Sequence, residues 1–355
     1  MSQITYLAGE QDGERILEIL ESAPANGSIE LLYTRRPNAY ISYKKESAET
    51  YVYAVKDEKQ MLGTVTEIVR KVYISGEVKK LGYICGLKTD IQYKGNVNWV
   101  KTFIQNLVKE DIDSYFCSII SDNAYARKLF EKKRRRTMNM NHLQGYTTYM
   151  LAPYFKFKTD DRDYNFRQAS KTDERVILEF LNSEGKRKDF FPVMESLNQF
   201  TDLNTKDFYI LEYNSEIVAV GALWKQTGYR QYLVKKYHGL YKVARYLNPL
   251  LKLLGYIQLP KEEEVLDFPM LSFFISKDKD PEYYKVFLNH INSVIKKSYG
   301  MYVVGAMASS FEHEIYSKLK NIHFDTQIYE IEFILAKGKK LNIQPDNLWL
   351  ECGLL

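Results

Sequence analysis

The sequence has few cysteines and no long apolar run, and each of these absences excludes a class of protein. The three cysteines among 355 residues, Cys85, Cys117 and Cys352, are far apart and form no CxxC pair, so they indicate no disulfide framework. No uninterrupted apolar stretch reaches the ~18–20 residues that span a bilayer. The N-terminal stretch MSQITYLAGEQDGERILEIL carries acidic residues where a signal peptide has a basic region and an apolar core. We therefore expect a cytoplasmic protein with reduced thiols and no transmembrane segment.

Excess charge of one sign and metal-ligand motifs are also scarce. Lys and Arg number 50 against 45 Asp and Glu, which is too small an excess for a general electrostatic attraction to nucleic acid. The five histidines show no HxxxH or HExxH spacing, so we expect no metal site. Neither a GxSxG elbow nor a P-loop occurs, which argues against hydrolases and nucleotide-binding proteins of those types.

One run of five basic residues, Lys132–Arg136, needs its own interpretation. It follows the helical pattern AYARKLFEKK, and cations near a helix C-terminus complement the helix dipole. We interpret the run as a solvated helix end and expect no nucleic-acid partner. Contact with a phosphate of a cofactor or with an acidic substrate remains an alternative.

The chain contains a regular alternation of strand and helix patterns. After a helix near 12–21, hairpin strands at 50–69 and 70–90 turn at 57–59 and 75–76, and helical spacing begins at Val97. A buried strand at 114–120, a helix at 124–133 and a closing strand at 145–151 follow. The order recurs with a helix at 172–185, a hairpin at 207–223, a strand at 270–276, a helix from Tyr284, a strand at 301–307, a helix at 311–321 and a strand at 326–335. The chain therefore reads as two copies of one α+β plan.

The polar, turn-rich stretch APYFKFKTDDRDY separates the two copies. We predict a first domain over 1–152, a linker over 153–163, a second domain over 164–338 and a tail over 339–355. The second copy carries an insertion at 233–260 with leucines near helical spacing among basic residues. Because Pro249 interrupts this pattern and Gly255 ends it, we predict two short helices that pack on the domain and cover the cleft between the halves. The alternative is a basic amphipathic helix that lies on a membrane. We prefer the two packed helices and expect no membrane contact.

The segment DNAYARKLFEKK resembles a motif of the GNAT superfamily of acyl-CoA-dependent N-acyltransferases. The motif positions here are Asn123, Ala126, Leu129, Phe130, Glu131 and Lys132. The preceding loop, GLKTDIQYKGNVNW, resembles the superfamily's Arg/Gln-x-x-Gly-x-Gly/Ala signature in either of two registers. With Lys94 at the basic position, Val97 and Trp99 replace the two glycines; with Gln92 and Gly95, Val97 is the remaining departure. The resemblance, which extends to bacterial tandem-GNAT proteins, implies a fold of two tandem GNAT-like α+β domains of the three-layer α/β type. Each domain would have a mixed, mostly antiparallel sheet flanked by helices.

The resemblance implies a binding site for acetyl-CoA or another acyl-CoA in the first copy. Backbone N–H groups at a helix N-terminus bind a pyrophosphate, and glycine permits close approach. The backbone contacts expected for the pantetheine and thioester come from Leu87, Lys88 and Thr89. The contacts expected for the pyrophosphate come from Lys94, Gly95, Asn96, Val97 and Asn98. The pantetheine arm is expected to meet Asn123, with Ala126 and Phe130 on the same helix.

The second copy departs from this pattern at the corresponding loop, SKDKDPEYYKVF. Asp280 and Pro281 suit the N-cap and first position of a helix. However, Asp278, Asp280 and Glu282 place carboxylates where a phosphate would bind, so we expect no coenzyme A in this half. Tyr316 stands where the superfamily keeps a general-acid tyrosine, whereas the first copy has Phe130 there.

The function implied is acyl transfer to the amine of a small molecule or peptide. A general base takes the proton of the amine, and backbone N–H groups stabilise the oxyanion. The catalytic base is not readable from the sequence; Asp90 is the nearest carboxylate to the motif, and Tyr316 is the other weak candidate. Two alternatives remain open: an aminoacyl-tRNA-dependent transferase of GNAT-like fold, and a non-catalytic binding protein built from two decayed domains.

Overall fold

A computed structural model describes residues 3–22, 28–93, 106, 109, 111–130, 138–160, 162–333 and 341–355. The strands are β1 (Ile4–Leu7), β2 (Ile29–Thr34), β3 (Thr50–Lys56), β4 (Met61–Ile74), β5 (Glu77–Thr89), β6 (Ser114–Ile120), β7 (Met138–Leu151), β8 (Tyr164–Gln168), β9 (Phe208–Tyr213), β10 (Glu216–Trp224), β11 (Gln231–Tyr237), β12 (Met270–Ser276), β13 (Tyr302–Met307) and β14 (Asn321–Phe333). The helices are α1 (Gly13–Glu21), α2 (Ala39–Lys44), α4 (Ala124–Phe130), α5 (Glu174–Gly185), α6 (Leu240–Ala244), α7 (Asn248–Leu253), α8 (Pro281–Ser298) and α9 (Phe311–Ser317). The predicted order of elements is confirmed within these ranges, whereas the helix expected from Val97 lies outside them.

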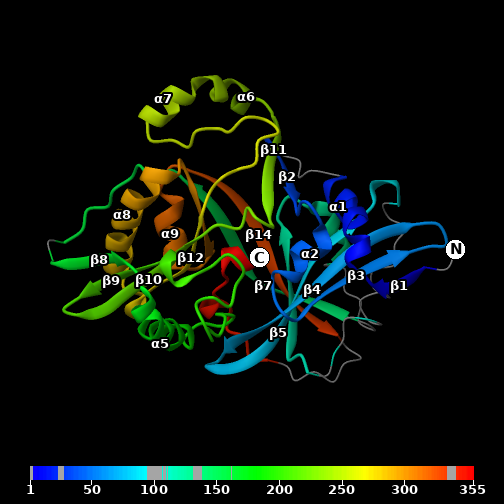
Figure 1. The fold of residues 1–355 in the computed structure, drawn as a ribbon, viewed down its shortest axis with the longest axis horizontal. Helices are drawn as coiled ribbons and strands as arrows, with labels where there is room; N and C mark the ends of the chain where they lie inside the picture. Colours follow the sequence, from blue (N-terminus) through cyan, green and yellow to red (C-terminus); the bar gives the residue numbers. More distant parts are fainter. Residues whose placement is uncertain are drawn as a thin grey trace.

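Twelve strands form one continuous sheet in the order β1-β3-β4-β5-β6-β14-β7-β13-β12-β10-β9-β8, and β2 pairs with β11 in a separate ribbon (Figure 1). Two hairpin turns follow the predicted residues. Ser75 and Gly76 join β4 to β5, Asn214 and Ser215 join β9 to β10, and all four have positive φ. Two successive positive φ values give the twist that fits a tight hairpin.

The final strands of the two halves are exchanged at the centre of the sheet. β14, from the end of the chain, lies between β6 and β7, and β7 pairs with β13 on its other side. The tandem plan of two mixed, mostly antiparallel sheets is therefore present, but the sheets merge into one. The predicted domain boundaries stay a prediction, since the second copy supplies a strand to the sheet of the first.

Each half contains one parallel strand pair, and the two pairs run in opposite directions. β5 runs parallel to β6, and β12 runs parallel to β13. Between these pairs, β6, β14, β7 and β13 are successively antiparallel. The C-terminal ends of β5 and β6 therefore point in one direction along the strand axes, and those of β12 and β13 point in the opposite direction.

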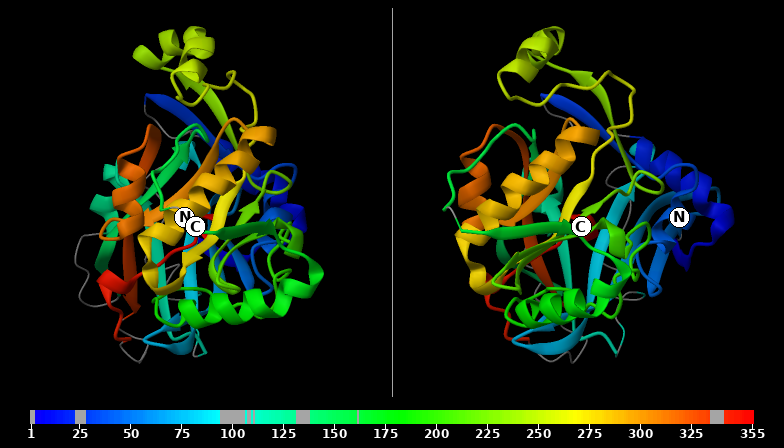
Figure 2. Two further views of the ribbon diagram at one scale, coloured as in Figure 1. Left: turned by 90° about the vertical axis from the view of Figure 1, so that its left-hand side faces the viewer. Right: turned by 60° about the vertical axis from the view of Figure 1, so that its left-hand side comes forward.

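Helices cover both faces of the sheet in the second half (Figure 2). Ile177 and Leu181 of α5 pack with Ile210, whereas α8 packs with the next residue along β9, Leu211. Because successive side chains of a strand point to opposite faces, α5 and α8 lie on opposite sides of the sheet. This is the three-layer arrangement expected from the sequence.

The insertion between β10 and β12 forms two short helices, as predicted, beyond the β2–β11 ribbon at one end of the molecule (Figures 1 and 2). Their inner side packs on the rest of the chain through Tyr241, Ala244 and Leu251, which are partly buried against a core cluster. None of the residues of α6 and α7, all of which are described, is fully buried. The expectation that the helices cover the cleft between the halves stays a prediction. No described helix is long and apolar enough to cross a membrane.

Candidate functional site

The parallel strands of the first half separate toward their C-terminal ends. Within the described residues, the pairing of β5 with β6 runs from Leu81 and Ser114 to Ile84 and Cys117. Beyond this point Gly86 has a φ of +59°, and the register between β4 and β5 shifts in a bulge. The bulge and the end of the pairing mark the place where β5 and β6 part within the described residues.

The predicted residues Leu87, Lys88 and Thr89 lie on the part of β5 that has separated from β6. All three are half-buried, and burial lowers the pKa of Lys88. The structure therefore places them on the stretch of β5 that follows the last residue paired with β6, and their part in ligand binding stays a prediction. Lys94, Gly95, Asn96, Val97 and Asn98, expected at the pyrophosphate, lie outside the described residues, as does the basic run Lys132–Arg136.

Helix α4 begins at the same open end, directly after β6. The Asn123 Oδ1 accepts a hydrogen bond from the Ala126 N–H at 3.0 Å, so this side chain caps the helix. The cap uses the carbonyl oxygen of the amide, and the Asn123 side chain is exposed, with its Nδ2 as a donor. The backbone of Phe130 belongs to α4, and its side chain lies outside the described atoms. Ala126 packs, partly buried, against the same core cluster as Leu87, and Asn123 precedes it at the start of α4.

The carboxylate of Asp90, at the end of β5, is engaged by protein donors. It is buried, forms an ion pair with Arg15, and accepts a hydrogen bond from the Gln92 N–H at 2.9 Å. Arg15 contacts its Oδ2 and the Gln92 N–H donates to its Oδ1, so both oxygens have protein partners. The catalytic role of Asp90 stays a prediction.

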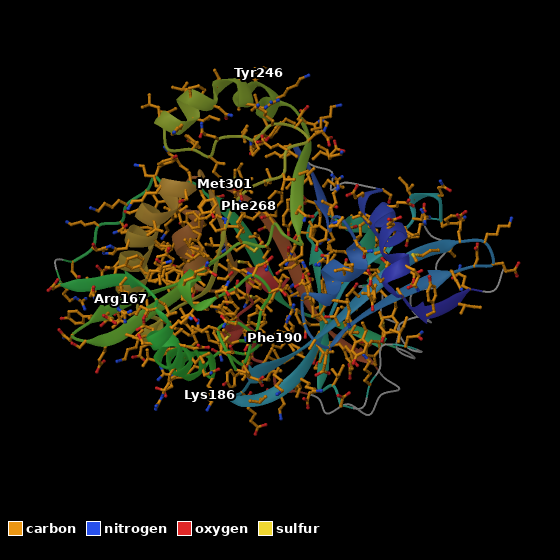
Figure 3. The ribbon with its side chains drawn as sticks, in the orientation of Figure 1. Arg167, Lys186, Phe190, Tyr246, Phe268 and Met301 are labelled. Atoms are coloured by element: carbon orange, nitrogen blue, oxygen red, sulfur yellow. The ribbon has the colours of Figure 1, made fainter. Side chains whose placement is uncertain are left out.

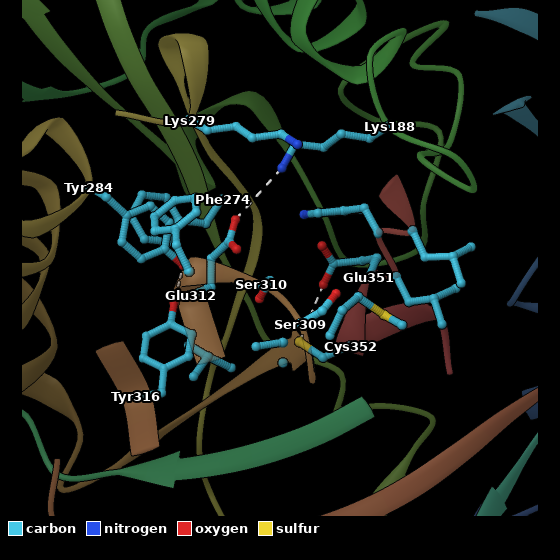
Figure 4. A pocket seen from close by; sticks show the side chains of 18 of the residues that line it. Lys188, Phe274, Lys279, Tyr284, Ser309, Ser310, Glu312, Tyr316, Glu351 and Cys352 are labelled. Carbon is cyan, nitrogen blue, oxygen red and sulfur yellow. Dashed lines mark hydrogen bonds and ion pairs between the residues drawn. The ribbon is translucent and has the colours of Figure 1, made fainter. Parts of the chain in front are cut away.

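The strands of the second half separate even earlier and enclose a pocket of about 280 Å³ (Figure 4). In the described structure, Met270 pairs with Val303 and the two strands then diverge. Phe273, with a φ of +51°, occupies the bulge that corresponds to Gly86. The pocket lies between β12 and β13, and the tail residues 346–352 form one of its walls.

Buried charges line this pocket. The Lys188 Nζ lies 3.6 Å from a carboxylate oxygen of Glu312, and burial lowers the pKa of this lysine. Lys279 also lines the pocket, near Lys188 in Figure 4. The hydroxyl groups of Tyr284 and Tyr316 are hydrogen-bonded to each other, and burial raises the pKa of both, so both stay protonated near neutral pH. Tyr316 therefore lies in a pocket, where it can donate a proton, although it is already partnered.

Glu351 joins this pocket to the first half. It is buried, and it accepts hydrogen bonds from the Phe273 N–H at 2.5 Å and the Gly353 N–H at 3.0 Å. Burial raises the pKa of Glu351 despite these donors. A second, small cavity, lined by Tyr83 and Phe116 of β5 and β6, shares Glu351 and Leu350 with the large pocket. Glu351 thus stands between the large pocket and the place where β5 and β6 begin to separate.

Carboxylates of the protein surround the N-terminus of α8 and disfavour an anion there. As predicted, Asp280 is the N-cap and Pro281 begins the helix, and the Asp280 side chain accepts from the Glu282 N–H at 2.7 Å. Glu184 accepts from the Asp278 N–H at 3.2 Å, and the Asp278 carboxylate pairs with Arg187 at 2.5 Å. Two backbone donors at this end, the N–H groups of Asp278 and Glu282, are therefore already bonded to carboxylates of the protein.

Sequence reasoning did not find Lys188, Glu312 or Glu351. Lys188 follows α5, Glu312 lies on α9 and Glu351 lies in the tail, so more than 150 residues separate the first from the last. No motif connects them, and their common feature is that tertiary packing buries all three charges. Among the described residues, no group of three His, Cys, Asp or Glu side chains could hold a metal ion.

No protein-family model matches the sequence, and no curated protein matches it in sequence. Solved structures do match its fold. The chain is similar to a conserved protein from Enterococcus faecalis V583 described as a probable N-acyltransferase, with a TM-score of 0.53, 8% identity, and coverage of 95% of this chain and 74% of the other. It is also similar to a GCN5-related N-acetyltransferase from Anabaena variabilis, with a TM-score of 0.54, 7% identity and coverage of 92% and 72%. Similarity to Saccharomyces cerevisiae N-myristoyltransferase with bound myristoyl-CoA has a TM-score of 0.58, 10% identity and coverage of 98% and 86%.

These matches cover 92–98% of this chain, so the likeness in fold includes both halves. The fold is that of the GNAT superfamily, in a tandem arrangement, as the resemblance of DNAYARKLFEKK implied. At identities of 7–10%, the likeness establishes the fold alone.

Proposed function

We propose that the protein is an acyl-CoA-dependent N-acyltransferase whose acyl donor binds between β5 and β6. The observation that carries the proposal is the separation of these parallel strands after Ile84 and Cys117, next to the bulge at Gly86. Where two parallel strands part, an amide-containing chain can form backbone hydrogen bonds between them, and a backbone N–H can polarise a thioester carbonyl.

The donor's contacts follow from the placement of the described residues. The backbone of Leu87, Lys88 and Thr89 would bind the pantetheine chain, and the Asn123 Nδ2 would donate to one of its carbonyl groups. Lys94, Gly95, Asn96, Val97 and Asn98 remain the proposed pyrophosphate contacts, on the sequence argument alone. The acyl group, acetyl or longer, is not specified by these contacts.

The acceptor amine would enter through the pocket of the second half and pass Glu351. The small cavity beside Tyr83 and Phe116 shares Glu351 with that pocket, so the route reaches the end of the paired part of β5 and β6. In the reaction the amine nitrogen forms a bond to the thioester carbon, the C–S bond breaks, and coenzyme A leaves as a thiolate. Glu351 would take the proton from the amine, because a carboxylate with a raised pKa is a better base near neutral pH.

The second half is the other candidate site for the acyl donor, since its pocket of about 280 Å³ is larger than the cavity beside Tyr83 and contains Tyr316. The acidic residues at the N-terminus of α8 argue against coenzyme A binding in this pocket. Asp280 and Glu184 already accept from the backbone N–H groups that would face the pyrophosphate. We therefore assign the donor to the first half.

Calorimetric titration with acetyl-CoA, followed by amine acetylation assays, tests the assignment. We expect one site per chain. Asn123→Ser keeps an oxygen to cap α4 but removes the amide donor, and should weaken binding about tenfold. Ser310 caps α9 in the second half, where its Oγ accepts from the His313 N–H at 3.2 Å, so Ser310→Ala is the matched control and should leave the affinity unchanged.

Two equivalent sites, or a loss of affinity in Ser310→Ala instead of Asn123→Ser, would contradict the assignment. Binding of acetyl-CoA without transfer to any amine in a broad panel of small molecules and peptides would favour a binding protein over an enzyme. Preferential binding of aminoacyl-tRNA would favour the transferase of that class.

A further inference from the structure

The outer surface of the α6–α7 arm, here residues 239–256, is unusually apolar for an exposed segment. Half of the large apolar side chains that are exposed among the described residues belong to this arm: Leu240, Val243, Tyr246, Leu247, Leu250, Leu253, Leu254 and Tyr256. Leu240 and Leu253 are 86% and 82% exposed, and Tyr246 lies at the far end of the arm in Figure 3. Concentrated exposure of this kind marks an interaction surface.

The inner surface of the arm already has its partner within the protein. Tyr241, Ala244 and Leu251 pack, partly buried, against a core cluster that includes Ile257 and Leu259. A helix that is apolar on all sides is normally covered on all sides. The exposed leucines are therefore not needed to attach the arm, and their outer surface is left for another partner.

The arm is held in a defined position. The Asn248 side chain donates to the Leu259 carbonyl and accepts from the Leu259 N–H, both at 2.8 Å. The returning chain also pairs with β11, through the Glu263 N–H to the Val234 carbonyl at 2.7 Å and the Leu266 N–H to the Tyr232 carbonyl at 2.8 Å. The β2–β11 ribbon and the returning segment thus hold the apolar surface in place at one end of the molecule (Figures 1 and 3).

The charge of the arm has one sign. Lys242, Arg245 and Lys252 lie among the leucines, and the sequence contains no acidic residue between Glu216 and Glu262. The acids nearest along the chain, Glu262 to Glu264, lie in the segment that returns beside β11, where Glu263 pairs with Lys235 at 2.8 Å. The exposed end therefore combines apolar side chains with cations.

We propose that the outer surface of this arm binds the interfacial region of an anionic lipid bilayer. Leucines would enter the acyl boundary, the tyrosines would lie at headgroup depth, and the stems of Lys242, Arg245 and Lys252 would reach up to lipid phosphates. The two helices, of five and six residues, are joined by the 3-10 turn Arg245–Leu247 and lie at one end of the molecule, where a bilayer can reach them (Figure 1). The sequence-based expectation of no membrane contact rested on these helices packing on the domain; their inner side does so, whereas the leucines of their outer side stay exposed.

Flotation of the full chain with lipid vesicles tests this proposal. Binding to phosphatidylcholine vesicles that contain phosphatidylglycerol should exceed binding to pure phosphatidylcholine by on the order of a hundredfold, from three cations near the surface. It should fall as salt screens the cations. Leu240→Glu with Leu253→Glu should reduce binding more than about tenfold. The matched control, Ile4→Glu with Leu7→Glu on β1, changes residues that are 57% and 60% exposed and should bind like the wild type.

A second variant locates the contact without removing apolar surface. In Leu253→Trp, the emission that the added indole contributes beyond that of the three native tryptophans should shift to the blue when anionic vesicles are added. Lipid-borne quenchers should reduce this added emission. Absence of binding to anionic vesicles, binding that the arm variant does not weaken, or an unshifted indole would overturn the proposal. Self-association of the chain in solution that Leu240→Glu with Leu253→Glu abolishes would also overturn it, because the partner would then be a second copy.

Discussion

A buried cluster of three arginines around Glu46 joins the two halves and makes a sharp prediction about stability. The Glu46 carboxylate lies 2.7 Å from Arg35, 3.2 Å from Arg70 and 4.0 Å from Arg230. Arg35 and Arg70 belong to the first half, and Arg230 precedes β11 in the second. Glu46, Arg35 and Arg230 are all buried. One carboxylate therefore neutralises part of the charge of three guanidinium groups in the interior.

Glu46→Gln keeps the shape of the side chain and removes its charge. Breaking a buried ion pair by removing one partner costs about 3–5 kcal/mol, because the remaining charge is left uncompensated. Three arginines share Glu46, so we expect a loss at the upper end of this range in the free energy of unfolding. Urea denaturation at neutral pH, followed by circular dichroism, measures the loss as a lower midpoint with an unchanged slope.

The pH dependence of the loss provides a second test. Burial alone would raise the pKa of Glu46, but the charges of Arg35, Arg230 and Arg70 offset burial and hold the pKa below its usual value. A lowered folded-state pKa gives stability that is fully present above about pH 5 and is lost as the pH falls through the folded pKa. The difference between wild type and Glu46→Gln should therefore shrink at acidic pH.

The control for this prediction is an exposed ion pair in the same half. Glu49 lies 3.1 Å from Lys80, and the side chains are 44% and 30% exposed. Glu49→Gln should cost no more than about 1 kcal/mol, since exposed pairs contribute little. If Glu46→Gln cost as little as Glu49→Gln, the three arginines would not depend on Glu46, and the reasoning would be refuted.

Three further predictions concern the reaction and the bulge. Glu351→Gln should lower kcat/KM by roughly 10²–10⁴-fold and remove a rise of activity with pH through its raised pKa; an unchanged pH profile would exclude it as the base. Tyr316→Phe should change kcat by less than about tenfold, because the donor is assigned to the first half, and a loss as large as that expected for Glu351→Gln would move the chemistry to the second half. Gly86→Ala should destabilise more than Gly76→Ala in thermal melts. Both glycines have positive φ, but a Cβ at Gly86 would meet the Tyr43 hydroxyl at 2.3 Å, whereas at Gly76 the nearest atom is 3.8 Å away; equal melting temperatures would contradict this.

Much of the fold could be predicted because local patterns carry it. The period-two strands, the turns at Ser75-Gly76 and Asn214-Ser215, and the cap at Asp280 each depend on neighbouring residues, and each is present. The exchange of β7 and β14 could not be predicted. The alternation of apolar residues would be the same whether β7 or β14 paired with β6. The choice between them depends on hydrogen bonds to a strand that is distant in the sequence.

The candidate site divides in the same way. The start of α4 directly after Asn123 follows from a motif with fixed spacing, whereas the role of Leu87–Thr89 in donor binding stays a prediction. The large pocket depends on Lys188, Glu312 and Glu351, which come from three distant segments. Nothing in the neighbourhood of any one of them in the sequence distinguishes it from the other lysines and glutamates of the chain.

By itself, the sequence determined the tandem α+β plan, the motif that begins α4 at Asn123, and the acidic residues at the N-terminus of α8. These features arise from contacts within a few residues along the chain. Only the tertiary structure decided that the sheets merge, that Glu351 stands between two cavities, and that the arm points outward. Each of these depends on which surfaces become buried together, and burial is a property of packing between segments that are remote in the chain.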